Sequence, residues 1–324
     1  MALRTTRVCS PEITQDQYTL LTEPQTSGGL LAAVLRRAGV DVSLLVTERH
    51  VAAIRKNGLA VIAPDGRFSV EIQAELDPRV IGACDVVVVT PKMWAVEALA
   101  PTLKPLLKED TVVIPVQNGI DAPGLLARTL GWEHVVYGSA SMNAALEEPG
   151  VVRQRNPNYG LTVAEKDGRE SARLLEVKKT FGAAGVSVEI GTDGPALLWD
   201  KFIGLVSNSS LCALLRSPMG VVQQDDDCWA LYSAVFNEVV AVGRASGISI
   251  PPEKAAARLA RARTSTPMVM SSLAVDLIAG NRLELPWLGG RVRELGREHG
   301  IPTPANDFIW AALKPFLAGK APAG

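Results

Sequence analysis

Apolar runs alternate with amphipathic segments through the first part of the chain, a pattern that predicts a parallel sheet covered by helices. Tyr18–Thr22 (YTLLT) predicts a short buried strand, and Leu30–Arg37 (LLAAVLRR) predicts a helix that ends at Ala38-Gly39. Asp41–Val46 (DVSLLV) predicts a second strand. The three segments form a strand–turn–helix–strand unit of the dinucleotide-binding type.

The alternation continues to about residue 190. Cys84–Thr90 (CDVVVVT) is continuously apolar, as is typical of a central strand in a parallel sheet. Helices are predicted at 50–57, at 94–107 with an interruption near Pro101 and Pro105, and at 170–184; strands are predicted at 59–62, 68–72, 111–116, 135–137, 151–154, 159–163 and 186–190.

From about Asp193 onward the periodicity becomes helical and strand signals almost disappear. Predicted helices lie at 196–215, 227–245, 252–263, 273–279, 289–299 and 305–317. The turn-like segment Gly191–Gly194 separates the two patterns. We therefore expect an α/β protein with an N-terminal Rossmann-type doubly wound sheet over 1–192 and an all-helical C-terminal domain over 193–324.

Composition narrows the classes of partner and location. The chain has 324 residues, 47% hydrophobic and 21% charged, and a net charge of −1, which gives no reason to expect nucleic acid or a membrane surface as a partner. No apolar run has transmembrane length, and the first residues lack the core of a secretory signal. The four cysteines form no C-x-x-C pair and the three histidines are scattered, so we expect a cytoplasmic protein without a metal site.

The turn after the first strand departs from the expected G-x-G-x-x-G pattern. Residues 23–28 read EPQTSG, so only the last glycine is present. Side chains at Glu23 and Gln25 obstruct the approach of a pyrophosphate, and the charge of the glutamate opposes it. Donors remain at the start of the following helix. We expect that a cofactor would be bound there by Thr26, Ser27, Gly28 and Gly29.

Polar side chains follow the strands at the edge where an open α/β sheet binds ligands. Thr47 and Arg49 follow the second strand, Lys92 follows the third and Asn118 follows the fourth. Taken alone, Lys92 fits a ribose or phosphate contact and a solvated lysine equally well. Asn118 is better explained as an Asx turn beside a glycine.

The helical part offers a second group of polar residues with two interpretations each. Lys201 lies on an apolar helix face, either snorkelling to water, which composition alone favours, or desolvated with a lowered pKa. Ser271 is expected to cap a helix, and Asp276 and Glu284 are expected to be surface acids.

Four segments together resemble the ketopantoate reductase (2-dehydropantoate 2-reductase) family. They are HVAAIRKNGL at 50–59, QNGI at 117–120, WDKF at 199–202 and MSSLAVDLIAGNRLEL at 270–285, in order within a similarity that runs from about Leu30 to Phe316. The resemblance implies an enzyme that reduces a small 2-oxo acid to a 2-hydroxy acid, with NADPH and substrate between the two domains.

The resemblance implies a role for particular side chains. Lys201 matches the general acid that protonates the carbonyl oxygen. Glu284 matches the carboxylate that contacts the substrate hydroxyl and the lysine network. Ser272 matches a donor to the substrate carboxylate, Asp276 belongs to the same pocket, and Asn118 lies beside nicotinamide and substrate.

The expected substrate pocket differs from that of the family. Family members usually carry asparagines four and eight residues after the lysine, where this chain has Leu205 and Ser209, with Asn208 one residue out of phase. A leucine cannot hydrogen-bond a hydroxy acid. A different or larger oxo acid is therefore a second interpretation, and Asn208 stays a candidate substrate contact.

The cofactor end also differs. Thr47 stands where the family usually has an arginine for the 2′-phosphate, so NADP is expected through Arg49 or Arg55, with NAD as the alternative. Lys92 matches a cofactor contact. A non-catalytic or cofactor-impaired binding protein on the same fold is the competing hypothesis. A homodimer is left open.

The segment from about Glu12 to Val34 resembles a short piece of selenophosphate synthetase, through YTLLTEPQTSGGLLAAV. We carry no function over from it. We interpret the segment as a replacement of the family's usual start by gene fusion or by a misplaced start.

Overall fold

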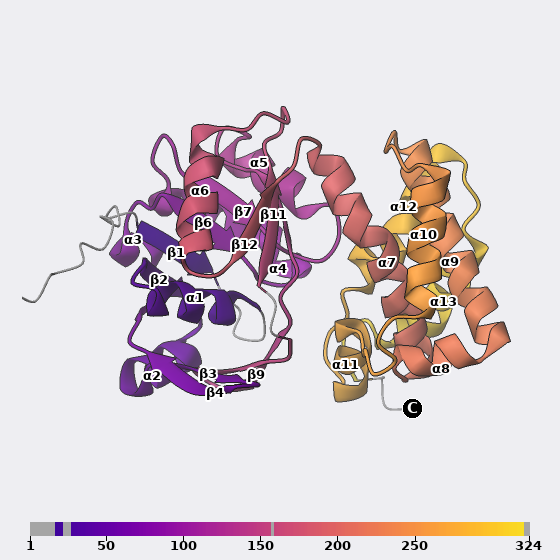
Figure 1. Ribbon diagram of the computed structural model, residues 1–324, viewed down its shortest axis with the longest axis horizontal. Coiled ribbons are helices and arrows are strands. Elements are labelled where there is room, and N and C mark those ends of the chain that lie inside the picture. Colours follow the sequence, from indigo (N-terminus) through magenta and orange to yellow (C-terminus); the bar gives the residue numbers. More distant parts are fainter. Residues whose placement is uncertain (1–16, 22–26, 157–158, 321–324) are drawn as a thin grey trace, which may run out of the picture.

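The computed structural model describes residues 17–21, 27–156 and 159–320. Glu23, Gln25 and Thr26, three residues of the atypical turn, lie outside them. Strands gather in one half of the molecule and helices fill the other, and the long helix α7 (Gly194–Leu215) leads from the first half into the second (Figure 1).

A five-stranded sheet in the order β5-β2-β1-β6-β7 forms the centre of the first domain. Every neighbouring pair is parallel, which confirms the predicted doubly wound sheet. Its strands are β1 (Gln17–Leu21), β2 (Asp41–Leu45), β5 (Gln73–Glu75), β6 (Val86–Val89) and β7 (Val112–Pro115). The segment that resembles selenophosphate synthetase thus supplies β1, the middle strand, paired in register with β2 and β6.

Helices cover both faces of this sheet, and β6 shows why its sequence is apolar throughout. Val86 and Val88 pack into the core on the α1 side, whereas Val87 and Val89 pack into the core that α4 and α5 cover. The helices of this domain are α1 (Ser27–Arg37), α2 (Glu48–Asn57), α3 (Pro78–Ile81), α4 (Met93–Leu99), α5 (Ala122–Leu130) and α6 (Ala172–Ala183), with the 3-10 helix η1 (Ala100–Leu106) after α4.

A second sheet, in the order β4-β3-β10-β9, lies on the other side of α1. A Cβ atom on Gly29 would lie 2.9 Å from a methyl group of Val152, so this glycine lets α1 approach the second sheet closely. The strands are β3 (Leu59–Ala63), β4 (Gly66–Val70), β9 (Ala144–Glu148) and β10 (Val151–Gln154). A third sheet joins β8 (Tyr137–Ala140), β11 (Gly160–Ala164) and β12 (Ser187–Ile190) in the order β12-β11-β8.

The second domain is built around α7, whose start is fixed locally. The carboxylate of Asp193 accepts a hydrogen bond from the Ala196 amide at 2.9 Å, and Pro195 occupies the first turn. Around α7 lie α8 (Met219–Gln224), α9 (Asp226–Ala245), α10 (Pro252–Arg263), α11 (Ser272–Ala279), α12 (Gly289–His299) and α13 (Pro304–Leu313), with 3-10 helices η2 (Leu285–Trp287) and η3 (Lys314–Phe316). Within the described ranges no helix has the length and apolarity to cross a membrane.

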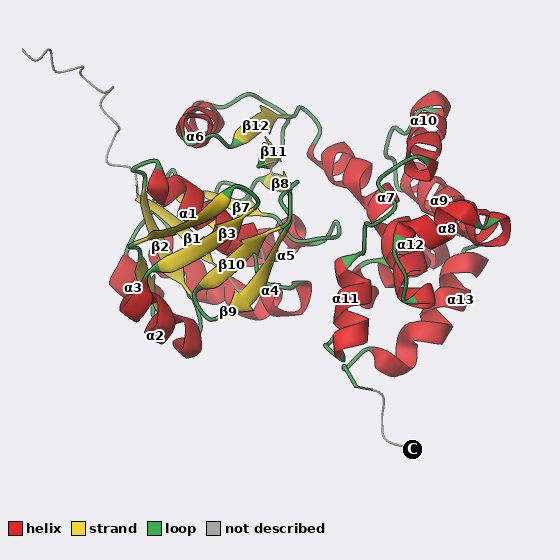
Figure 2. Ribbon diagram, turned by 60° about the horizontal axis from the view of Figure 1, so that its bottom comes forward, coloured by secondary structure: helices red, strands yellow, loops and turns green. Residues whose placement is uncertain are grey.

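The two domains face each other along one side. In both views α11 of the helical domain lies opposite the β9 end of the sheet domain (Figures 1 and 2). The sequence did not predict β5, β9, α3, α5, α8 or η2, and of these β9, α5 and η2 reach the side where the domains meet.

Candidate functional site

A cleft of about 660 Å³ lies at the carboxyl ends of the central strands. The chain order of the sheet reverses between β1 and β6, and ligands of such sheets bind beyond that point. Ser27 at the start of α1, Thr90–Lys92 after β6 and Val116–Asn118 after β7 line the cleft from the sheet domain. From the helical domain come Lys201, Met270, Ser272, Val275, Asp276, Asn281 and Glu284.

Lys201 projects from α7 to the edge of the sheet domain. Its ammonium group donates a hydrogen bond to the carbonyl oxygen of Ala140, at the end of β8, at 3.0 Å. Burial lowers the pKa of Lys201 to about 8, although the negative charge of Glu284 acts in the opposite direction. The ammonium group thus contacts the other domain within the cleft, and a pKa near 8 suits a proton donor near neutral pH.

Lys92 crosses the cleft in the other direction, from the sheet domain to the helical domain. Its ammonium nitrogen lies 2.9 Å from an Asp276 oxygen and 3.2 Å from a Glu284 oxygen. All three side chains are nearly buried, with exposed fractions of 11%, 12% and 7% in the same order. The interpretations of Lys92 as a solvated lysine and of Asp276 and Glu284 as surface acids are therefore wrong.

The remaining oxygens of the two carboxylates are also occupied. Glu284 accepts a hydrogen bond from the backbone amide of Met93 at 3.1 Å, at the N-terminus of α4. Asp276 accepts one from the side-chain amide of Asn281 at 3.2 Å. Burial lowers the pKa of Lys92, but the two carboxylates outweigh burial and the net shift is upward. Lys92 is thus held as a cation that fixes both acids.

Asn118 and Ser272 line the cleft on opposite sides. Within the described residues no hydrogen bond is found for either side chain, so Asn118 does not form the Asx turn that its sequence context favours. Gly119 follows with a φ of 106°, and a Cβ atom there would lie 3.1 Å from the carbonyl oxygen of Trp287. The glycine therefore lets the β7 loop approach η2 of the helical domain. Ser271 caps α11 by accepting a hydrogen bond from the Ala274 amide, as predicted.

The cofactor end of the cleft is bounded by the start of α1. The hydroxyl of Ser27 donates to the carbonyl oxygen of Met142 at 2.8 Å, and the buried Gly28 and Gly29 follow it. Gln117 is 8% exposed; its side-chain nitrogen donates to the Val89 carbonyl, and its side-chain oxygen has no hydrogen-bond partner among the residues that the structure describes. A buried acceptor without a partner is unusual and fits a cleft that holds a ligand with hydroxyl or amide groups.

The residues that line the cleft do not include Thr47, Arg49, Arg55 or Asn208, nor Gly28 and Gly29, which directly follow Ser27. Thr47 and Arg49 are exposed at the start of α2, and Arg55 is held by Glu75 at 2.6 Å. Asn208 lies inside the helical domain, where its side-chain oxygen accepts a hydrogen bond from the Tyr232 hydroxyl at 2.9 Å. The substrate contact expected of Asn208 is therefore not formed by this geometry.

The structure adds residues that the sequence did not single out. Arg155, Asn143 and the apolar side chains of Met270 and Val275 line the cleft together with the predicted residues. Arg155 directly follows the strand predicted at 151–154, and polar residues at strand ends are candidate ligand contacts in such sheets. The strand belongs to the second sheet, and no local pattern places its end beside the first sheet.

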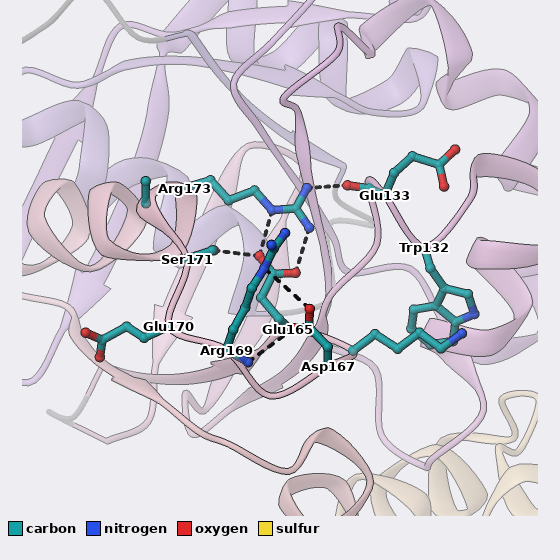
Figure 3. Close-up of a pocket in the computed structure, with 10 residues that line it drawn as sticks. Trp132, Glu133, Glu165, Asp167, Arg169, Glu170, Ser171 and Arg173 are labelled. Carbon is teal, nitrogen blue, oxygen red and sulfur yellow. Dashed lines mark hydrogen bonds and ion pairs between the residues drawn. The ribbon is translucent and has the colours of Figure 1, made fainter.

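A wider hollow of about 840 Å³ lies outside this cleft, between α6 and Trp132. It contains none of the predicted residues. Its buried carboxylate, Glu165, is already bound by Arg173 through two hydrogen bonds of 2.7 Å and by Ser171 at 2.6 Å (Figure 3). Because this acid is already satisfied, we interpret the hollow as a structural ion-pair site and place the candidate site in the other cleft.

The fold and the cleft together define a two-domain protein of the dinucleotide-binding class, with a helical domain that completes the site. The sequence profile of ketopantoate reductase PanE/ApbA matches residues 27–168, and that of the C-terminal part of ketopantoate reductase PanE/ApbA matches residues 196–316. The chain therefore belongs to the ketopantoate reductase family.

Individual relatives extend over nearly the whole chain. The 2-dehydropantoate 2-reductase of Halobacterium salinarum is 28% identical over 283 residues, covering 87% of this chain and 92% of that protein. That of Pyrococcus horikoshii is 26% identical over 291 residues, covering 89% and 93%.

Solved structures agree with this assignment. A PanE/ApbA family ketopantoate reductase from Ralstonia eutropha has a TM-score of 0.84 at 27% identity, covering 92% of this chain and 98% of that one. D-mandelate dehydrogenase, solved with NADH and anilino(oxo)acetate, also has a TM-score of 0.84, with the same coverage, but at 18% identity it shows the fold alone.

Proposed function

We propose that this protein reduces a small 2-oxo acid to the 2-hydroxy acid with NADPH or NADH. The observation that carries the proposal is the ammonium group of Lys201, which lines the cleft at the switch point of the sheet and has a pKa lowered to about 8. Membership of the family and the relatives named 2-dehydropantoate 2-reductase support the same reaction class. Ketopantoate is the first substrate to test.

The described residues offer a binding place for the cofactor, even though the first turn is atypical. The backbone amides at the start of α1, at Ser27, Gly28 and Gly29, are donors without helical partners and favour an anion. The acceptor oxygen of Gln117 and the side chain of Asn118 lie in the same cleft. These residues would hold the cofactor, which supplies a hydride when bound.

Lys201 would donate a proton to the substrate carbonyl oxygen as that oxygen gains negative charge. Its hydrogen bond to the Ala140 carbonyl fixes where the ammonium group lies. Lys92 keeps Glu284 and Asp276 in place, and Ser272 offers a hydroxyl donor to the substrate carboxylate. The protein's contribution is thus to orient the substrate and to provide one proton.

Because Lys201 must carry its proton in the reducing direction, the rate should depend on pH with a definite sign. We expect kcat/KM for reduction to be constant below pH 8 and to fall about tenfold per pH unit above it, while oxidation of the hydroxy acid rises over the same range. Initial rates from pH 6 to 10 measure both. A reduction rate that stays constant to pH 10 would contradict the assignment.

Binding of the nicotinamide cofactor is the direct test of the proposed function. We expect NADPH or NADH to bind at micromolar concentration in calorimetry, and the absorbance of the reduced cofactor to fall when ketopantoate or another 2-oxo acid is added. The ratio of the two dissociation constants then gives the cofactor preference. Arg49, two residues after Thr47, is the candidate ligand of a 2′-phosphate. If neither cofactor binds, the protein is a cofactor-impaired member of the family and the proposal fails.

A further inference from the structure

Within the described residues, three cationic side chains line the cleft, and two of them have partners. Lys92 is bound by two carboxylates, and Lys201 donates to a backbone carbonyl. Arg155 is exposed at the end of β10, and no hydrogen bond or ion pair of its guanidinium group occurs in the part of the chain that the structure describes. Its charge is therefore available to a ligand.

The position of Arg155 is fixed relative to the start of α1 by a chain of hydrogen bonds. Ser27 donates to the carbonyl oxygen of Met142 at 2.8 Å. The next residue, Asn143, accepts a hydrogen bond from the Arg155 amide at 2.8 Å and donates its own amide to the Asn156 side chain at 3.1 Å. The segment that carries Arg155 is thus held beside the N-terminus of α1.

The same segment, residues 140–143, contacts three of the groups that line the cleft. Ala140 contacts Lys201, Met142 contacts Ser27, and Asn143 contacts Arg155. Three residues of extended chain span at most about 10 Å, so the backbone positions that contact Lys201, Ser27 and Arg155 lie within about that length of one another.

Anion binding at this end needs more than the first turn offers. Residues 23–28 contain one glycine and one glutamate, so side chains stand where glycines usually let the backbone approach a diphosphate, and an opposing charge is added. A guanidinium group binds phosphate oxygens through two parallel hydrogen bonds and supplies the missing charge. Gln117, whose nearly buried side-chain oxygen has no hydrogen-bond partner among the described residues, lines the same cleft and adds an acceptor to it.

We propose that Arg155 binds the diphosphate of the nicotinamide cofactor and replaces part of the anion binding that glycine residues of the first turn usually provide. The inference rests on the proposed function, because it needs a dinucleotide in the cleft. It assigns a binding role to a residue outside the central sheet and its loops.

The test compares Arg155→Met with a matched control on the same strand. Arg153 is also exposed, but its guanidinium group is bound by Glu147 at 2.7 and 2.8 Å. Arg153→Met therefore removes the same charge without reaching the cleft. We expect Arg155→Met to weaken the binding of NADPH and of NADH alike, by about tenfold or more in calorimetry, since a charge-assisted hydrogen bond is lost. Arg153→Met should leave both dissociation constants within about twofold, and Arg155→Lys should recover part of the loss.

Other results overturn the inference in distinguishable ways. If NADPH alone is weakened, Arg155 recognises the 2′-phosphate; if the KM of the oxo acid rises while cofactor binding is unchanged, it recognises the substrate. Equal cofactor binding by the wild type and Arg155→Met overturns this inference and leaves the proposed function standing. A wild type that binds neither cofactor overturns both. Thermal midpoints of all variants show whether each is folded.

Discussion

Lys201→Met is expected to lower kcat for reduction by about 10²- to 10⁴-fold, the range that general acid catalysis contributes. The methionine has no proton to donate, and no other described side chain that lines the cleft combines a pKa near 8 with this position. Steady-state rates at pH 7 with saturating cofactor and 2-oxo acid measure the loss. Cofactor binding should change little.

Lys201→Arg separates the loss of the proton from the loss of the charge, and Lys179→Met is the matched control. Lys201→Arg keeps a cation beside the Ala140 carbonyl but cannot give up a proton near neutral pH, so it should be nearly as inactive. Lys179→Met removes an exposed lysine that pairs with Glu176 on α6 and should retain full activity. An active Lys201→Arg enzyme would mean that the residue acts by charge alone.

Lys201→Met should raise the stability of the folded protein, although it lowers the rate of reduction. In the unfolded chain Lys201 titrates near 10.5, and in the folded protein near 8, so burying the ammonium group destabilises the folded state below pH 8. Between pH 8 and 10.5 the unfolded chain binds more protons, and wild-type stability rises with pH. Lys201→Met should therefore be more stable at pH 7 by roughly 1–3 kcal/mol, with the gap closing toward pH 10.5.

Lys92→Met is expected to reduce the free energy of unfolding by about 3–5 kcal/mol, because it leaves two nearly buried carboxylates without their cation. Asp276 and Glu284 would then repel each other across the space that the ammonium group fills. Denaturant unfolding followed by circular dichroism measures the change.

The matched control is Lys254→Met, which removes an exposed lysine 3.2 Å from Asp200. Exposed pairs contribute little, so its cost should be below about 1 kcal/mol. Adding Glu284→Gln to Lys92→Met should restore part of the lost stability, since it removes one of the two charges. Equal unfolding midpoints for Lys92→Met and the wild type would show that the three charges are not coupled.

Local sequence determined the elements better than it determined the environments of single side chains. β6 could be predicted because a parallel strand buried on both faces must be apolar at every position. β5 has three residues, two of them Gln73 and Glu75, and so lacks any periodic signal. α8 has six residues and no cap hydrogen bond from a side chain, so its sequence carries neither a helical period nor a start signal.

The candidate site was predictable only through the family resemblance. Composition placed Lys201 in water, whereas its partner is the carbonyl of Ala140 in the other domain. It placed Asp276 and Glu284 on the surface, because their partner, Lys92, lies more than 180 positions earlier. A contact between distant segments cannot be recognised from the residues around either one. The partner of Asn208 could not be predicted for this reason either: its side chain lies one position out of phase on α7 and contacts Tyr232.

The ion cluster at Lys92 also determines when the site can exist during synthesis. Lys92 belongs to the domain that leaves the ribosome first, whereas Asp276 and Glu284 lie in the last fifth of the chain. At about 5–20 residues per second, the sheet domain has many seconds to fold before its partners are made. Until α11 and the residues after it dock, Lys92 and the amide of Met93 at the start of α4 have no carboxylate partners. The completed cleft is therefore a product of the final stage of biosynthesis, and a chain that stops before residue 276 can hold the sheet but not the site.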